Sequence, residues 1–68
     1  MQYTEMRENE LNAMLAPDGP LRRAVYAIVL KLRYASTSKE TEDLTKELDT
    51  AIDDYAKHAV ELDRLKRS

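Results

Sequence analysis

The sequence predicts an all-α protein: an antiparallel helical hairpin with an additional N-terminal helix, paired as a dimeric helical bundle. Three observations lead to this prediction. They are a heptad repeat over residues 41–65, two short breaks rich in proline, glycine and small polar residues, and a composition typical of helical proteins. We expect one small helical domain over residues 1–68, with helices at about 3–16, 20–35 and 38–66.

The heptad repeat is the strongest signal in the chain. One set of positions recurs every seven residues, and a second set follows three residues behind it. The first set is Thr41, Leu48, Tyr55 and Leu62, and the second is Leu44, Ala51, His58 and Leu65. Side chains at this spacing form a narrow seam along one long helix, of the kind found in coiled coils, and the seam needs another helix to cover it.

Two breaks divide the chain into three helices. The tetrapeptide at 17–20 contains two prolines, which cannot lie inside a helix. The second proline suits the first position of the next helix, with Asp18 or Gly19 as the cap before it. At the second break, Thr37 and Glu40 match a capping box, in which a hydroxyl and a carboxylate satisfy amides at the start of a helix.

The size of the chain favours association with other chains. A domain of 68 residues buries only about 60% of the surface that its unfolded chain exposes. The absence of cysteine excludes disulfides and thiolate zinc sites, and a single histidine makes a structural metal unfavourable. Oligomerisation is the remaining source of added stability.

Helix lengths lead to the prediction of a homodimer. The third helix would span about 43 Å and the second about 24 Å, so the hairpin would leave Leu62 and Leu65 beyond the end of the second helix. Burying each leucine is worth about 1.5–3 kcal/mol, and a second copy would supply the cover. Whether the two copies run parallel or antiparallel stays open. The expected dimer interface comprises Leu44, Leu48, Ala51, Ile52, Tyr55, His58, Leu62 and Leu65.

The second helix is apolar on two sides, which predicts that it lies between two packing partners. One side should face the third helix. The other side, with its tyrosines and arginines, has the composition of interaction hot spots. The first helix could be a core element or a binding arm, and both interpretations stay open. The expected partner-binding residues are Tyr3, Met6, Met14, Arg22, Tyr26, Leu30, Arg33 and Tyr34.

Charge is distributed unevenly, although the formal net charge is only −2. Residues 38–54 contain seven acidic residues and two lysines, a local net charge of −5, whereas residues 17–36 carry +3. We expect these segments to attract each other within the fold. His58 lies one helical turn from Asp54 and Glu61, which could form a metal or pH-sensitive site, but a structural histidine is the favoured interpretation.

These patterns favour binding over catalysis. No cluster of nucleophile, general base or phosphate-binding glycines is present, so we expect no enzyme activity, no cofactor and no metal. The favoured function is a small protein-binding regulator or adaptor acting as a homodimer on a larger protein. By analogy of size and architecture, it could be a phage-type inhibitor of a host protein or a secretion-type co-chaperone. A nucleic-acid-binding helical dimer is less favoured, because few cations share a face.

The expected location is the cytoplasm, or a host's cytoplasm if a virus encodes the chain. The N-terminus has no basic segment followed by an apolar run, which a secretory signal requires. The longest apolar run, residues 24–30, is too short to cross a bilayer, so no membrane association is expected.

Overall fold

The computed structural model describes residues 3–67 and, for Tyr3, the backbone alone. The chain forms three α-helices: α1 (Tyr3–Leu15), α2 (Pro20–Arg33) and α3 (Ser38–Arg67). No strand occurs in this part of the chain. The predicted all-α fold class is therefore confirmed, and each helix begins and ends within two residues of the expected position.

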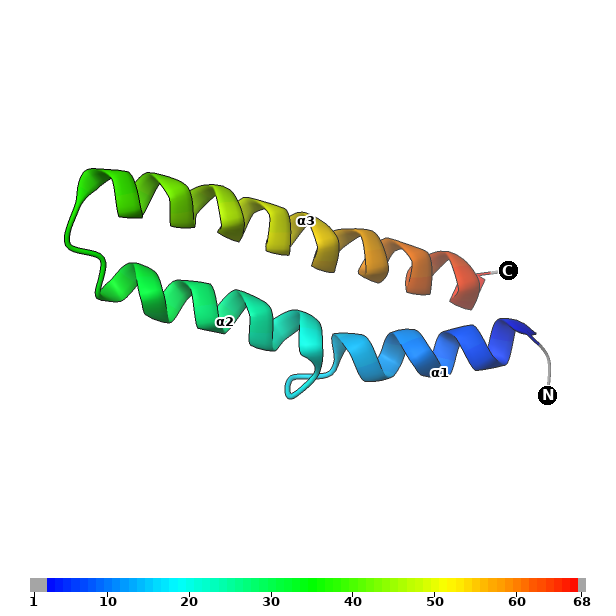
Figure 1. The fold of residues 1–68 in the computed structure, drawn as a ribbon. Helices are drawn as coiled ribbons and strands as arrows, with labels where there is room; N and C mark the ends of the chain where they lie inside the picture. The colour runs from blue at the N-terminus through cyan, green and yellow to red at the C-terminus, as the bar shows by residue number, and fades with distance from the viewer. Residues whose placement is uncertain (1–2, 68) are drawn as a thin grey trace.

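The helices form two antiparallel arms (Figure 1). α1 and α2 follow one another along one arm, which bends at their connection, and α3 runs back along both of them. α2 and the first half of α3 make the predicted hairpin, whereas α1 lies beside the second half of α3. The molecule measures 50 × 18 × 13 Å with a radius of gyration of 15.0 Å, against about 11 Å for a compact domain of this length. It is a thin, elongated structure.

The connection between α1 and α2 depends on Gly19, one of the two residues expected to cap α2. Its amide donates a hydrogen bond to the carbonyl oxygen of Ala16 at 2.8 Å, and its carbonyl accepts one from the amide of Arg23 at 3.1 Å. A Cβ at this position would lie 2.5 Å from the carbonyl oxygen of Ala13 and 2.7 Å from that of Met14. Glycine is required here because the chain passes close to the C-terminal carbonyls of α1.

The second connection ends in a hydroxyl cap at Thr37. The amide of Glu40 donates to Thr37 Oγ1 at 3.1 Å, as the capping box predicts. The reciprocal contact differs, because the Glu40 carboxylate accepts from the hydroxyls of Thr37 at 3.3 Å and Ser36 at 3.4 Å, not from a backbone amide. The cap satisfies one of the free amides at the start of α3 and so determines where that helix begins.

The core is small and depends on the contact between α1 and α3. Leu11 in α1 is fully buried, and Leu62 in α3 is 9% exposed; no other apolar side chain in the described residues is buried. The Arg7 guanidinium fixes α1 against α3, because its Nε and Nη2 donate to the two carboxylate oxygens of Glu61 at 2.6 and 2.9 Å. Such two-pronged pairing constrains orientation as well as distance.

This arrangement corrects the argument from helix lengths. Leu62 and Leu65 were expected to lie beyond any cover from their own chain, but Leu62 is buried and Leu65 is half-buried. The expectation was wrong because α1 continues the arm of α2 and lies beside the part of α3 that α2 does not reach (Figure 1). The chain therefore covers the end of its own long helix.

α1 is consequently a core element. Its inward face, at the spacing expected for one side of a helix, consists of half-buried Arg7, buried Leu11, and half-buried Met14 and Leu15. Met6, which the sequence grouped with Met14, is exposed. The apolar residues of α1 are spread around the helix, so their spacing alone did not identify the buried face.

Candidate interaction surface

The structure exposes more surface than its mass requires. The solvent-accessible surface is 5304 Å², whereas a compact folded protein of 7.9 kDa exposes about 4,400 Å². Much of the exposed surface is apolar. The large apolar side chains that remain exposed are Met6, Tyr26, Val29, Leu30, Tyr34, Ile52 and Val60. A cluster of such residues marks a candidate binding surface, whereas a single exposed one needs no explanation.

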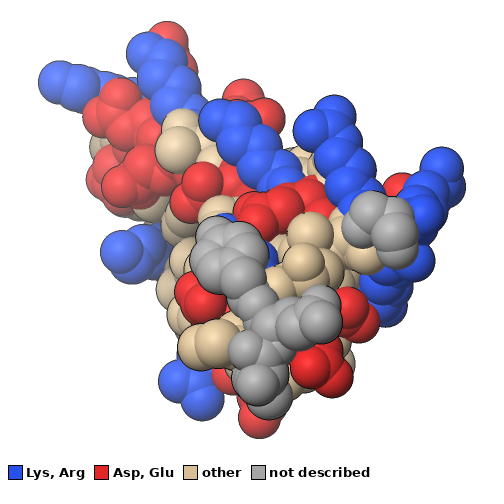
Figure 2. All heavy atoms as spheres, turned by 90° about the vertical axis from the view of Figure 1, so that its right-hand side faces the viewer, with Lys and Arg blue, Asp and Glu red and all other residues tan. Residues whose placement is uncertain are grey.

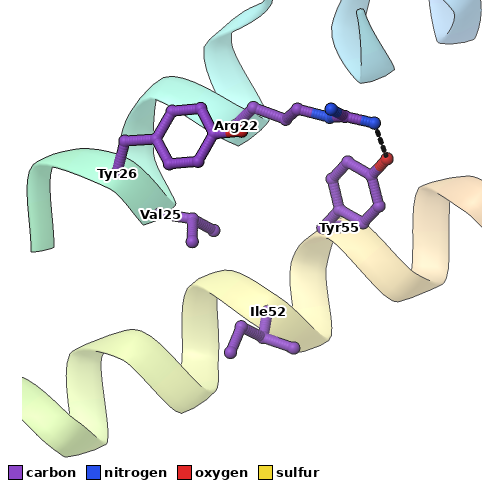
Figure 3. Close-up of a pocket in the computed structure, with 5 residues that line it drawn as sticks. All are labelled: Arg22, Val25, Tyr26, Ile52 and Tyr55. Carbon is purple, nitrogen blue, oxygen red and sulfur yellow. Dashed lines mark hydrogen bonds between the residues drawn. The ribbon is translucent and has the colours of Figure 1, made fainter. Parts of the chain in front are cut away.

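The most sharply defined feature of this surface is an open groove between α2 and α3 (Figure 3). Its volume is about 300 Å³, at the lower limit for small-molecule sites. Val25 points from α2 toward α3, and Ile52 lines the groove from α3. The lining residues are Arg22, Val25, Tyr26, Ile52 and Tyr55. The groove is therefore bounded by aliphatic and aromatic groups with a single charge.

That single charge is already engaged within the chain. Nη2 of Arg22 donates a hydrogen bond to the Tyr55 hydroxyl at 3.1 Å, and the guanidinium carbon lies 5.6 Å from the centroid of the Tyr55 ring. The hydrogen bond that Arg22 donates to Tyr55 is the main cause that raises the pKa of Arg22 above its ordinary value. The guanidinium stays charged, and its contact with the ring is of the cation–π kind. Arg22 therefore links α2 to α3 at the edge of the groove.

A second apolar feature runs along the outer side of α2. Tyr26, Leu30 and Tyr34 are spaced four residues apart, so they follow one another along a single side of the helix. All three are more than half exposed, with Tyr34 at 75%. We call these three residues the α2 stripe. Tyr26 belongs both to the stripe and to the groove, so the two features are continuous.

The heptad seam packs against helices of its own chain. Of the predicted dimer-interface residues, Ile52 alone is exposed, at 49%, and it lines the groove. The other predicted interface residues are buried or half-buried: Leu44, Leu48, Ala51, Tyr55, His58, Leu62 and Leu65. α1 and α2 of the same chain pack against this side of α3. A second copy would therefore have to dock beside the seam.

The predicted partner-binding residues divide into three groups. Arg22 and Met14 are half-buried, and the side chain of Tyr3 lies outside the described residues. The remaining five are exposed: Met6, Tyr26, Leu30, Arg33 and Tyr34. Tyr26, Leu30 and Arg33 lie on α2 and Tyr34 caps its C-terminal end, so the structure brings these four together and leaves Met6 apart on α1. The candidate partner-binding surface is therefore the outer side of α2.

His58 is held by the backbone of its own helix. Its Nδ1 lies 2.6 Å from the carbonyl oxygen of Asp54, so the ring N–H donates a hydrogen bond to that oxygen. Glu61, the other expected neighbour, is bound by Arg7, whose hydrogen bond is the main cause that lowers the pKa of Glu61. In the described residues, no group of three or more potential ligands is placed to hold a metal ion.

The expected ionic attraction between α2 and α3 does not take the form of ion pairs. Among the described residues, the ion pairs are those of Arg7 with Glu10 and Glu61, and two within α3. Arg23, Lys31 and Arg33 of α2 are therefore in none of these ion pairs, whereas Arg22 is bound to Tyr55 and Asp53 of α3 is paired with Lys57. At the end where α1 begins and α3 ends, basic and acidic groups lie next to one another (Figure 2).

Two parts of this surface were not identified from the sequence. Val29, one helical turn from Val25, is 48% exposed and extends the groove side of α2, yet it was not singled out. Ile52, which lines the same groove, was identified from the sequence as part of the expected dimer interface. The pairing of Arg7 with Glu61, by contrast, joins residues 54 positions apart and has no local signature.

In the residues that the structure describes, no helix is both long enough and apolar enough to span a bilayer. Comparison of the chain with protein-family models, with curated proteins and with solved structures found no match in any of the three.

Proposed function

We propose that this chain is a small, non-enzymatic, protein-binding regulator or adaptor that acts as a homodimer. The observation that carries the proposal is the surface in excess of a compact fold, about 900 Å² from the scaling of surface with mass. This excess is close to the roughly 800 Å² that each partner buries in a protein–protein interface of standard size. The exposed apolar side chains of α2 and α3 would supply the centre of such an interface.

The chemistry of the groove favours protein burial over catalysis. Its titratable groups are one arginine and two tyrosines, and Arg22 is bound to Tyr55. Aromatic residues and arginine are enriched at the centres of protein interfaces, where carboxylates and lysines are depleted. The groove is also open and shallow, whereas a small ligand is usually enclosed over most of its surface.

The part of the α2 stripe outside the groove, Leu30 and Tyr34, is the feature that we assign to a foreign protein partner. Side chains four residues apart on an exposed helix suit recognition by a hydrophobic groove on the partner. Such binding would allow the dimer to occupy a site on a larger protein, as an inhibitor or an adaptor does, with the cytoplasm as the expected compartment. No covalent step is involved.

Sedimentation equilibrium over a wide concentration range tests the homodimer. We expect a mass of twice 7.9 kDa at micromolar concentration and dissociation to the monomer on dilution. A single 7.9 kDa species at every concentration would contradict the proposal.

Quantitative capture from the native cell extract tests the foreign partner. We expect Leu30→Ala and Tyr34→Ala to weaken retention of a protein that the wild type retains. Val60→Ala serves as the control because Val60 is similarly exposed, at 50%, but lies on α3. Equal loss in all three variants, or in none, would contradict the assignment of the stripe.

Arg23, Lys31 and Arg33, the α2 cations outside the ion pairs of the described residues, support one alternative, a nucleic-acid-binding dimer. In that case affinity would fall steeply with salt, and Arg23→Glu and Arg33→Glu would weaken binding by similar amounts. The acidic residues of α3, which lie beside α2, argue against it because they would repel phosphates. Titration of duplex and single-stranded nucleic acid at two salt concentrations distinguishes the alternatives.

A further inference from the structure

The two sides of the α2–α3 hairpin differ in chemistry. One side, which we call the groove face, consists of Arg22, Val25, Tyr26, Val29, Ile52 and Tyr55. The other side also has a groove between α2 and α3, but it is lined by Lys46, Glu47 and Asp54 among apolar residues. Burying these three charges would require removing their water, which costs more than burying aliphatic groups. A helical partner would therefore be buried at lower cost on the groove face.

The charges of the chain form a pattern that is complementary to itself. α1 carries a net charge of −2, and α2 carries +4. Residues 38–54, the first half of α3, carry −5, and residues 55–67 carry +2 with histidine neutral. α2 packs against α3 and meets its middle where Arg22 binds Tyr55, whereas α1 meets its second half where Arg7 binds Glu61. The four segments thus occupy the corners of a rectangle, and each segment has a net charge opposite to that of the two segments next to it.

A second copy placed face to face matches this pattern. Two symmetric arrangements are possible, each with its two-fold axis in the plane between the facing copies. If the axis runs parallel to the helices, each α2 lies over the first half of the partner's α3, so a charge of +4 meets one of −5. If the axis runs across the helices, α2 lies over the partner's α1, and the first half of α3 lies over the second half of the partner's α3. Opposite signs meet in both arrangements. A symmetric dimer uses the same patch on both copies, so self-complementarity is the property that it requires.

We propose that a second copy of this chain docks on the groove face with its own groove face. The α2 and α3 helices of the two copies then pack together around Ile52 and Val25. This inference rests on the homodimer proposed above and assigns its interface. The heptad seam stays inside each chain, covered by α1 and α2. The excess surface matches the area that one copy buries in a standard interface. Leu30 and Tyr34 remain outside the interface and available to another protein.

Paired substitutions on α3 test the interface. Ile52 and Val60 are both β-branched and are 49% and 50% exposed, but only Ile52 lines the groove. We expect Ile52→Glu to raise the dimer dissociation constant at least about 100-fold, since it buries an unpaired charge, and Val60→Glu to leave it within a few-fold of the wild type. Circular dichroism would verify that both variants stay helical. Dimers of Ile52→Glu as stable as those of Val60→Glu would overturn the assignment.

A second measurement covers the case in which Ile52→Glu does not fold. The chain has no cysteine, so Ile52→Cys and Val60→Cys each introduce a single thiol. We expect the maleimide reactivity of the Ile52→Cys thiol to fall as protein concentration rises, while that of Val60→Cys stays constant. If the wild type dimerises and both thiols keep constant reactivity, the groove face is wrong and the homodimer stands. If the wild type is monomeric throughout, the homodimer itself fails.

Discussion

Truncation of Leu11 tests whether α1 completes the core. Leu11 is the one fully buried side chain in the described part of the chain, and it lies on the helix that packs against the second half of α3. Leu→Ala at a buried site removes apolar contacts and leaves a cavity, at a cost of about 2–5 kcal/mol. A chain of 68 residues has a free energy of unfolding of about 3–10 kcal/mol. We therefore expect Leu11→Ala to remove at least about a fifth of the stability, and more if the wild type lies in the lower part of that range.

The assay is urea denaturation followed by circular dichroism, at one fixed protein concentration because association would add to apparent stability. Leu30→Ala is the matched control: the same side chain is removed, but Leu30 is 54% exposed on α2. We expect the control to change the free energy of unfolding by no more than about 0.5 kcal/mol. Hydrogen exchange should also show that amides of α1 lose protection in Leu11→Ala before those of α2. Equal urea midpoints for the two variants would refute the core assigned to α1.

Three further predictions concern the turns and the link between α1 and α3. Gly19→Ala should lower the free energy of unfolding by about 1–3 kcal/mol in urea titrations, since its Cβ would meet carbonyl oxygens at 2.5 and 2.7 Å; unchanged stability would contradict the close approach. Thr37→Ala should cost about 1 kcal/mol and lower the melting temperature by roughly 4–8 °C, whereas Thr37→Ser should largely preserve the cap. Arg7 lowers the pKa of Glu61 in the folded protein. The stability that this pair contributes is therefore fully present above about pH 4.3, the pKa of an unperturbed glutamate. It is lost as the pH falls through the lower pKa that Glu61 has in the folded state. Urea midpoints of the wild type and Glu61→Gln should accordingly differ near neutral pH and converge in acid; a constant difference would exclude the pair as its cause.

The helix boundaries could be predicted because local chemistry determines them. The segment at 17–20 ends one helix and begins the next through proline and a glycine that accommodates a close backbone contact. Thr37 caps the start of α3 because its hydroxyl accepts a hydrogen bond from the amide of Glu40, three residues further along the chain. Such signals act within one helical turn, so they can be read from the sequence without knowledge of the fold.

The docking of α1 could not be predicted from the same kind of signal. Its apolar side chains do not form one stripe, and the residue that orients it, Arg7, is a charged group paired with Glu61 far along the chain. The length argument considered α2 alone as the cover for Leu62 and so assigned that role to a second copy. Which face of the hairpin stays open depends on this docking, and for that reason the groove around Ile52 emerged only from the structure.

Methyl NMR offers the most direct test of the proposed interface, because the chain contains two isoleucines on opposite sides of the hairpin. Ile52 lines the groove face, and Ile28 lines the charged groove on the other side. With selectively labelled isoleucine methyls, we expect the Ile52 resonance to shift between dilute and concentrated samples as the dimer forms, while the Ile28 resonance stays in place. A shift of Ile28 alone, or no shift at Ile52 while the mass doubles, would contradict the account.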